Sequence, residues 1–301
     1  MSERPILEVE RLTIRYGRLT AVEDLSLAVP QGSVYALLGR NGSGKSSTVR
    51  CLLGQQRATA GRARLLGLDA WKHRRTIMTT VGVVAETPNI PPEMTAGRLG
   101  RFMSAVSASW DGAKYDSRLE RFGVPRRTRF DRLSKGQQRQ LSLTAAISAS
   151  PQLLILDDPT LGLDAVARRE LFEELVGELA DCGTSVFITT HDLAGVEGIA
   201  DHIGIIKDGN LLIDEELETM KSRFRRLEFS SDEESLREAV AAEMQPLRSA
   251  VAGDEDVVVG GFDEGALGRI GKGEPAGQVT AVAMSLEEIF VALCGENGGD
   301  Q

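Results

Sequence analysis

The chain has 301 residues, of which 42% are apolar and 26% charged, and a formal net charge of −9. This length predicts about two domains, and the composition is ordinary for a globular protein. No run of about 18 apolar residues could span a bilayer, and the charged start, MSERPILEVERL, lacks the apolar segment of a signal peptide. Cys51, Cys182 and Cys294 are widely spaced, which favours reduced core residues of a cytosolic protein over disulfides or a metal site.

The negative charge is concentrated towards the C-terminus. Residues 221–301 contain 8 Lys and Arg against 16 Asp and Glu, so residues 1–220 are nearly neutral. We interpret this as a nearly neutral core followed by an acidic module. It argues against nucleic acid as a partner, because nonspecific binding of a phosphate backbone needs a positive surface. The basic cluster between Arg126 and Lys135 is interpreted as the solvated face of a helix.

Short strands dominate the first part of the chain. Two alternating segments are expected to pair as antiparallel strands with Gly17 at their turn, and the run SVYALLG is typical of a buried strand. A helix is expected to begin within GSGKSST. The strands predicted in this part are 6–16, 19–29, 33–39, 62–67 and 81–86.

Helical periodicity takes over from about 95 to 150, which predicts a helical insertion, about 88–150, between two strands of one sheet. Strands resume at 153–157 and 185–190 with a helix between them, and such strand–helix–strand units form a right-handed parallel sheet. DHIGIIKDGNLLID is predicted to be a closing hairpin that turns at Asp-Gly-Asn.

The pattern changes after about residue 218, where short strands alternate with helices and Gly- and Asp-rich loops. We predict two domains, 1–218 and 219–301, the second a small α+β module. Its predicted strands are RLEF, DVVVGGF and QVTAVAM, and its predicted helices are DEESLREAVAAE and SLEEIFVAL. In the last helix the packing residues are expected to be Leu286, Ile289, Phe290 and Leu293.

A glycine-rich loop, GRNGSGKS, follows the buried strand and matches the pattern GxxxxGKS in full. Its glycines allow backbone N–H groups to curl around phosphates at a helix N-terminus, where the helix dipole favours anions. Lys45 is expected to reach the phosphates, and Ser46 to offer its hydroxyl to Mg²⁺. The residues predicted to bind the nucleotide here are Gly39, Asn41, Gly42, Ser43, Gly44, Lys45, Ser46 and Ser47.

Two aspartates end the later apolar run LLILDDP. Asp157 stands where a P-loop ATPase places the carboxylate beside Mg²⁺, and Asp158 would point towards the water that attacks the γ-phosphate. His191 follows the next predicted strand, so it is expected at the same sheet edge as Asp157 and Lys45. Open α/β sheets bind ligands at that edge, which predicts a contact between His191 and the γ-phosphate.

The turn LSKGQQ, residues 133–138, precedes this run and resembles the LSGGQ signature of the ATP-binding subunits of ABC transporters. The resemblance covers residues 6 to about 215, and Lys135 is a tolerated variation within it. It implies an α/β P-loop NTPase of ABC type, with an antiparallel β subdomain and a helical insertion, followed here by the C-terminal α+β module. It also implies that the chain binds ATP and Mg²⁺ and is an ATPase.

In that family two subunits meet head to tail, and the signature of one closes on the nucleotide held by the other. The resemblance implies that Asp164, within LGLD, crosses the dimer interface, that Tyr16 stacks on adenine and that His191 is the switch histidine. The signature residues implied to contact the partner's nucleotide are Ser134, Gly136 and Gln137.

Two residues depart from the family pattern. Glu86 stands where the family has a glutamine that touches Mg²⁺ and senses the membrane partner, and Asp158 stands where it has a general-base glutamate. Aspartate is one methylene, roughly 1.5 Å, shorter, so a rate loss of about 10-fold or more is expected. Two hypotheses follow: a homodimer hydrolyses ATP slowly with help from Glu86, or the chain pairs with a different ATPase subunit.

The C-terminal element SLEEIF resembles the end of many drug- or antibiotic-export subunits. The resemblance thus implies an exporter, with a separate transmembrane permease subunit and a location at the cytoplasmic face of the membrane. The helical insertion and the segment from Glu86 to Met94 would form the docking surface. The alternative is a regulatory ATPase that uses the same dimeric engine without coupling to transport.

Overall fold

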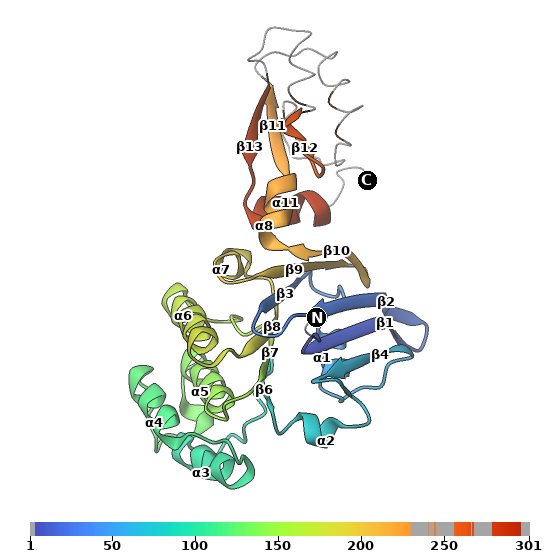
Figure 1. Ribbon diagram of the computed structural model, residues 1–301. Helices are drawn as coiled ribbons and strands as arrows, with labels where there is room; N and C mark the ends of the chain where they lie inside the picture. The colour runs from blue at the N-terminus through green and yellow to red at the C-terminus, as the bar shows by residue number, and fades with distance from the viewer. Residues whose placement is uncertain are drawn as a thin grey trace. The chain divides into compact units, whose positions relative to one another are not determined.

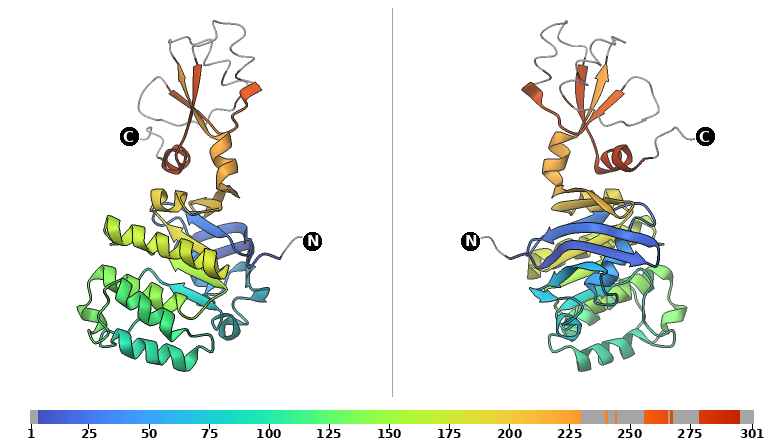
Figure 2. Two further views of the ribbon diagram at one scale, coloured as in Figure 1. Left: turned by 60° about the vertical axis from the view of Figure 1, so that its left-hand side comes forward. Right: turned by 90° about the vertical axis from the view of Figure 1, so that its right-hand side faces the viewer.

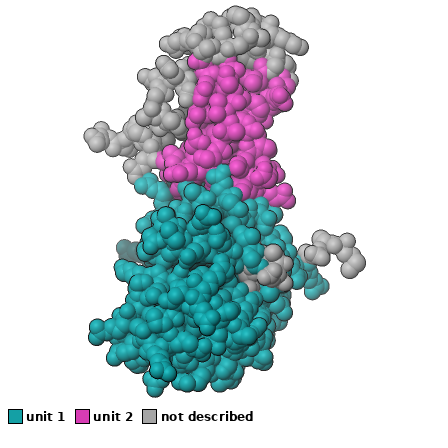
Figure 3. Space-filling view, turned by 90° about the vertical axis from the view of Figure 1, so that its left-hand side faces the viewer, with its two compact units in different colours: residues 1–214 teal, residues 215–301 magenta. Residues whose placement is uncertain are grey.

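The computed structural model describes residues 4–229, 240, 244, 256–265, 267 and 279–295. It divides into two compact units, residues 1–214 and residues 215–301 (Figure 3). Each unit has a buried apolar cluster of its own. Within the described part of the chain, no helix is long and apolar enough to cross a membrane.

A six-stranded sheet runs through the first unit in the order β10-β9-β3-β8-β7-β6 (Figure 1). The pairs β3–β8, β3–β9, β7–β8 and β6–β7 are parallel, which confirms the predicted strand–helix–strand topology. Nearly every residue of β3, β7 and β8 is buried, as expected for central strands covered on both faces. The strands are β3 (Val34–Leu38), β6 (Val81–Val84), β7 (Leu153–Asp157), β8 (Ser185–Thr190), β9 (His202–Lys207) and β10 (Asn210–Glu216).

A second, four-stranded sheet has the order β2-β1-β4-β5 and is antiparallel. Gly17 turns between β1 and β2 with a φ of 59°, a conformation that glycine adopts readily. Leu12 of this sheet, Leu52 of helix α1 (Lys45–Leu52) and Ile155 of β7 belong to one buried cluster, so both sheets share a core. The strands are β1 (Leu7–Tyr16), β2 (Leu19–Val29), β4 (Ala60–Leu65) and β5 (Leu68–Asp69).

The helical insertion between β6 and β7 contains α3 (Ala96–Val106), α4 (Gly112–Arg121), the 3-10 turn η1 (Phe130–Arg132) and α5 (Lys135–Ile147) (Figures 1 and 2). Thr95 and Asp111 cap α3 and α4 by accepting backbone hydrogen bonds from the first turns. The buried Tyr115 hydroxyl donates to the Ala96 carbonyl at 2.8 Å, which ties α4 to α3. These helices enclose a small core of their own, as the helical periodicity predicts.

An ion-pair cluster joins α4 to α6 (Ala165–Cys182), the helix between β7 and β8. The Glu174 carboxylate, only 5% exposed, pairs with Arg118 and also with Arg121, whose Nη1 lies at 2.8 Å. Arg118 is itself only 12% exposed. Buried charges are stable only with close partners of opposite charge. This cluster therefore fixes the insertion to α6, which packs on the parallel sheet. The remaining helices of the first unit are α2 (Arg74–Ile77) and α7 (Leu193–Glu197).

The second unit contains the antiparallel sheet β12-β11-β13 with the helices α8 and α11. Its three predicted strands are confirmed, whereas the helix predicted at 232–243 lies outside the described residues apart from Val240. Leu286 and Ile289 of α11 are buried, and Phe290 and Leu293 are half-buried. The elements are α8 (Leu217–Arg223), β11 (Arg225–Phe229), β12 (Asp256–Val259), β13 (Val279–Ala283) and α11 (Leu286–Cys294).

Replacing Glu174 by alanine should destabilise the protein by about 3 kcal/mol, because it deprives the buried Arg118 of its counter-charge. The neighbouring Glu173→Ala variant is the matched control, since Glu173 is exposed and pairs along its own helix with Arg169. That change should cost less than about 0.5 kcal/mol. Urea unfolding of the three proteins measures both effects, and equal losses for the two variants would contradict the assignment.

Candidate active site

The segments that carry the predicted nucleotide residues meet at one edge of the parallel sheet. Leu38 of β3 pairs in register with Thr190 of β8, and Asp157 of β7 pairs with Thr189. Because these strands are parallel, the segments that follow them leave the sheet on the same side. The glycine-rich loop, the acid pair and the histidine after β8 are therefore neighbours, although they are far apart in the sequence.

The glycine-rich loop between β3 and α1 is packed against two other strands. A Cβ atom at Gly44 would lie 2.5 Å from the Ala21 carbonyl oxygen of β2, and one at Gly39 would lie 2.5 Å from the Ile206 carbonyl oxygen of β9. Gly44 is also the N-cap of α1 with a φ of 112°, which other residues rarely adopt. Neither position admits a side chain, and the start of α1 offers its backbone N–H groups to an anion.

The other predicted loop residues differ in exposure. Asn41 and Gly42 are exposed at the tip of the loop, and Ser46 and Ser47 are half-buried. Ser43 is buried, and its Oγ has no hydrogen-bond partner within the part of the chain that the structure describes. An orphaned hydroxyl in a loop of this kind suits a ligand that brings acceptor oxygens, such as a phosphate.

Lys45 is folded back over the loop and is only 8% exposed. Its ammonium group donates to the carbonyl oxygens of Gly39 at 2.6 Å and Arg40 at 3.1 Å. Burial lowers the pKa of Lys45, while the carboxylates of Asp158, Asp157 and Glu86 act in the opposite direction. The lysine is thus a cation positioned between the loop and three carboxylates that come from two other strands.

Ser46 and Asp157 bring two oxygen atoms together below the loop. Ser46 Oγ lies 3.5 Å from Asp157 Oδ1, and the Thr189 hydroxyl donates to the same carboxylate oxygen at 2.6 Å. Hydroxyl and carboxylate oxygens are the ligands that Mg²⁺ takes. No cluster of three or more His, Cys, Asp or Glu side chains among the described residues could hold a metal by itself. An ion here would therefore share these oxygens with a phosphate.

Asp158 and His191 are in direct contact. Asp158 Oδ2 lies 2.9 Å from His191 Nδ1, and the Asp158 backbone N–H donates to the Thr189 carbonyl at 2.8 Å. The other carboxylate oxygen, Oδ1, is buried and has no hydrogen-bond partner among the residues described. A buried carboxylate oxygen needs a donor, so Oδ1 is the natural acceptor for a water molecule.

Arg139, like Thr189, is a residue of this region that the sequence patterns did not single out. It projects from α5, is 7% exposed, and donates from Nη1 to the Ala85 carbonyl at 2.6 Å and from Nη2 to the Glu86 carbonyl. Arginines in helices are usually exposed, and nothing in the local sequence marks this one as buried. The carboxylate of Glu86 acts on the same lysine as the acid pair, since all three oppose the effect of burial on the pKa of Lys45.

Tyr16 lies near the end of β1, beside α1, and its side chain is fixed through its hydroxyl group. The hydroxyl donates to Gln56 Oε1 at 2.5 Å, lies 3.2 Å from Ser47 Oγ and accepts from Arg50 at 3.2 Å. The residue is 42% exposed, so the ring is available for stacking. These contacts place the ring beside helix α1, and stacking on adenine stays a prediction.

The signature residues form a capping box at the start of α5. Ser134 Oγ accepts from the Gln137 backbone N–H at 3.1 Å, and Gln137 Oε1 accepts from the Ser134 N–H at 3.1 Å. The Gln137 side chain also donates to the Gly123 carbonyl at 3.0 Å. Asp164 similarly caps α6 by accepting from the Ala167 N–H at 2.9 Å. The contact of Gln137 with Gly123 links the start of α5 to the loop after α4, and Gly136 is half-buried in the first turn of α5.

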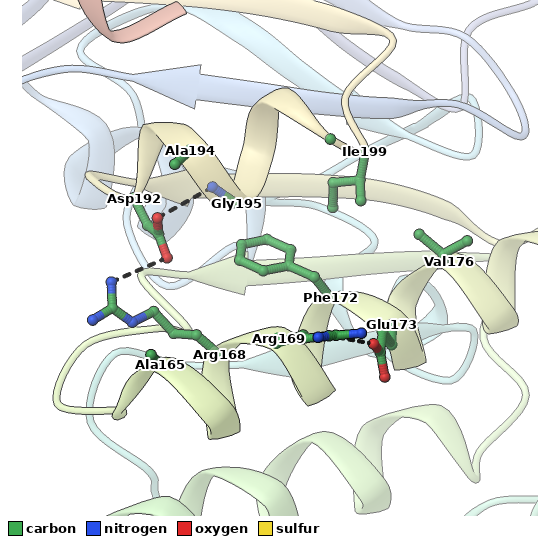
Figure 4. Close-up of a pocket in the computed structure, with 11 residues that line it drawn as sticks. Ala165, Arg168, Arg169, Phe172, Glu173, Val176, Asp192, Ala194, Gly195 and Ile199 are labelled. Atoms are coloured by element: carbon green, nitrogen blue, oxygen red, sulfur yellow. Dashed lines mark hydrogen bonds and ion pairs between the residues drawn. The ribbon is translucent and has the colours of Figure 1, made fainter.

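A groove of about 680 Å³ lies between α6 and α7 (Figure 4). Phe172 of α6 lies between the two helices and packs so tightly against Gly195 of α7 that no Cβ fits there. Asp192 caps α7 at Gly195 and lies 3.6 Å from Arg168 of α6. The helix that follows His191 is therefore tied to the helix that follows Asp164.

Comparison with known proteins identifies the family of the chain. A family model described as ABC transporter matches residues 22–161. The bacitracin transport ATP-binding protein BcrA of Bacillus licheniformis is 29% identical over 299 residues, covering 96% of this chain and 97% of that protein. The daunorubicin/doxorubicin resistance ATP-binding protein DrrA of Streptomyces peucetius is 33% identical over 223 residues, covering 72% of this chain and 67% of that protein.

A solved structure of an ATP-binding subunit of an ABC transporter superposes with a TM-score of 0.66 at 27% identity, covering 72% of this chain and 92% of that one. The fold and the phosphate loop therefore define a P-loop nucleotide-binding ATPase. More particularly, the chain belongs to the ATP-binding proteins of the ABC transporter family. It binds ATP and is the ATPase subunit of an ATP-driven transporter.

Replacing Tyr16 by alanine should weaken ATP binding by about 10-fold, because stacking of a base on an aromatic ring contributes about 1–3 kcal/mol. Tyr16→Phe is the matched control, since it keeps the ring and loses only the hydroxyl contacts. It should bind ATP within about 3-fold of the wild type. Calorimetric titration with ATP measures the affinities, and an alanine variant that binds as tightly as wild type would exclude stacking.

Proposed function

We propose that this chain powers export through a separate membrane subunit, by closing as a dimer on ATP. The observation that carries the proposal is a likeness across both units, since a bacitracin transport ATP-binding protein matches 96% of the chain. A second relative is named for resistance to two drugs, and resistance through an ATP-driven transporter implies removal of the drug from the cell. The terminal SLEEIF element, typical of export subunits, points in the same direction.

In this proposal ATP binds together with Mg²⁺. Ser46 Oγ and Asp157 Oδ1 would hold the ion jointly with phosphate oxygens, and Glu86 would assist from the end of β6. When bound, the ion supplies positive charge that neutralises the β- and γ-phosphates. The Thr189 hydroxyl keeps Asp157 in position through its 2.6 Å hydrogen bond. Lys45 contributes a second positive charge from within the glycine-rich loop.

Asp158 is proposed to orient the attacking water. Its Oδ2 is occupied by His191 at 2.9 Å, which leaves the buried Oδ1 to accept a hydrogen bond from water. Asp158 would then hold the water through Oδ1, while the hydrogen bond with His191 fixes the orientation of the Asp158 carboxylate. His191 in turn would reach the γ-phosphate from the carboxyl end of β8. Because aspartate is roughly 1.5 Å shorter than glutamate, this water is held less well, and hydrolysis is slow.

The dimer is proposed to place the signature of each chain on the nucleotide of the other. The capping box orders Ser134 and Gln137 before any partner arrives, so little flexibility is lost on closure. Asp164 stands at the start of α6, where it would cross the interface. Both a homodimer and a heterodimer with a second ATP-binding subunit are compatible with these contacts. In the heterodimer, this chain would complete the partner's site and form the slower site itself.

The membrane subunit is proposed to dock on the helical insertion and the segment from Glu86 to Met94. Phe102 and Val106 of α3 are exposed apolar residues on the insertion, at 55% and 59% exposure. A partner that covers them would hold the chain at the cytoplasmic face of the membrane. The alternative function is a regulatory ATPase with no membrane partner, in which these residues stay exposed.

Asp158 variants test the proposed hydrolytic site. Asp158→Glu should raise the kcat of the purified chain by about 10-fold, because the longer side chain reaches the water. Asp158→Asn should lower kcat by about 10-fold or more, since the amide is a poor base. Both should leave the affinity for ATP nearly unchanged. Phosphate release at saturating ATP measures the rates.

Fast hydrolysis by the wild-type chain alone would contradict both the slow homodimer and the heterodimer. A glutamate variant no faster than wild type would remove the geometric argument. If adding a second ATP-binding subunit raises the rate of phosphate release, and the increase depends on the acid of that subunit, the heterodimer would be supported.

Co-purification tests the membrane partner. The tagged chain, isolated from native membranes in mild detergent, should bring along a protein with several membrane spans. Phe102→Ser should lower the recovered amount about 10-fold, since an anchor residue at an interface contributes more than about 1 kcal/mol. Val176→Ser, at a 46% exposed position on α6, is the control and should change nothing. A wild-type chain recovered without any membrane protein would favour the regulatory alternative.

A further inference from the structure

Arg139 is a buried cation one turn after the signature capping box. It lies in the second turn of α5 and is 7% exposed, whereas its neighbour Lys135 at the start of the helix is exposed. Burying a guanidinium group is costly unless its charge and its donors are satisfied. The partners that satisfy Arg139 therefore show what the residue holds in place.

Those partners are a stretch of backbone and a set of acids. The two ends of the guanidinium fork donate to consecutive carbonyls, Nη1 to Ala85 at 2.6 Å and Nη2 to Glu86. Burial lowers the pKa of Arg139, and the carboxylates of Asp158, Glu86 and Asp157 oppose that shift. The acids of the nucleotide site thus compensate the positive charge of Arg139. The N–H groups of its guanidinium group bind the backbone of Ala85 and Glu86.

This backbone lies just beyond the end of a strand. Strand β6 ends at Val84 and is the edge strand of its sheet, paired only with β7. Beyond it, the chain runs through Pro88, Pro91 and Pro92, which cannot donate backbone hydrogen bonds. The side chain of Arg139 is what fixes Ala85 and Glu86 after the strand has ended. It does so from a helix that belongs to the insertion.

We propose that Arg139 is a positioning residue for ATP hydrolysis, which clamps the Glu86 backbone beside the acid pair and ties it to the helix that begins at the signature. The inference rests on the role proposed above for Glu86 and adds a residue to it. A displacement of α5, such as closure of the signature on a second nucleotide would cause, is then passed through the guanidinium fork to this chain's own acids. In this role Arg139 acts through the backbone of Glu86 and is not itself a catalytic residue.

A lysine cannot replace this arginine. Its ammonium group would keep the positive charge near the three carboxylates but would lack the planar fork that spans two consecutive carbonyls. Glutamine would lose the charge as well. Comparing Arg139→Lys with Arg139→Gln therefore separates the contribution of charge from that of geometry.

The test measures kcat, KM for ATP and thermal unfolding on full-length variants. Arg139→Gln should lower kcat about 10-fold with KM within about 2-fold of wild type. The kcat of Arg139→Lys should lie between those of the wild type and Arg139→Gln. Arg169→Gln is the matched control, because the Arg169 side chain is 82% exposed and pairs with Glu173 on its own helix, away from the acid pair. A merely structural role would lower the unfolding temperature and leave the kcat of the folded protein unchanged, which would overturn the proposal.

Combination with Glu86→Gln shows whether Arg139 acts through Glu86. If it does, the double variant should be little slower than the slower single variant, instead of showing the product of both losses. Losses that multiply would overturn the proposal, and Arg139→Lys provides the same cycle if Arg139→Gln does not fold. Glu86→Gln at the wild-type rate would show that the role proposed for Glu86 fails. If Glu86→Gln has a low kcat while Arg139→Gln has the wild-type kcat, the proposal for Arg139 is refuted and the role proposed for Glu86 stands.

Discussion

The nucleotide site depends on the register between β7 and β8. Asp157 is paired with Thr189, whose hydroxyl donates to the Asp157 carboxylate at 2.6 Å and whose carbonyl accepts from the Asp158 backbone N–H at 2.8 Å. One residue of β8 therefore fixes both acids, while His191 follows two positions later on the same strand end. A slip of one residue would turn each side chain to the opposite face of the sheet and dismantle the site.

Two cations from different parts of the first unit face the same three acids. Lys45 is the first residue of α1, directly after the glycine-rich loop, and Arg139 belongs to the helical insertion. Since buried charges need close partners, neither the loop nor the insertion can shift without a cost at the acid pair. The ion-pair cluster around Glu174 adds a second fixed point between the insertion and the sheet's helices. The acids proposed to act in hydrolysis are thus also the residues through which the glycine-rich loop and the insertion would affect each other.

Much of this could be predicted from the sequence, because the signals are local. Continuous apolar runs predicted the central strands, and the GxxxxGKS spacing predicted the loop and the start of α1. The contact between Asp158 and His191, the fork of Arg139 and the packing of Phe172 on Gly195 could not be predicted. Each joins elements distant in sequence, and no pattern within one element encodes the distance between two of them.

The glycine-rich loop also connects the antiparallel sheet to the parallel sheet. Gly44 rests on the Ala21 carbonyl of the antiparallel sheet and Gly39 on the Ile206 carbonyl of the parallel one, while Gly209 accepts from Glu23 at 2.9 Å and donates to Ser43 at 3.1 Å. A nucleotide bound as proposed, by this loop and by Tyr16, would link the same two sheets. ATP would then oppose movement of one sheet against the other, and a distortion of either sheet would change the affinity for ATP.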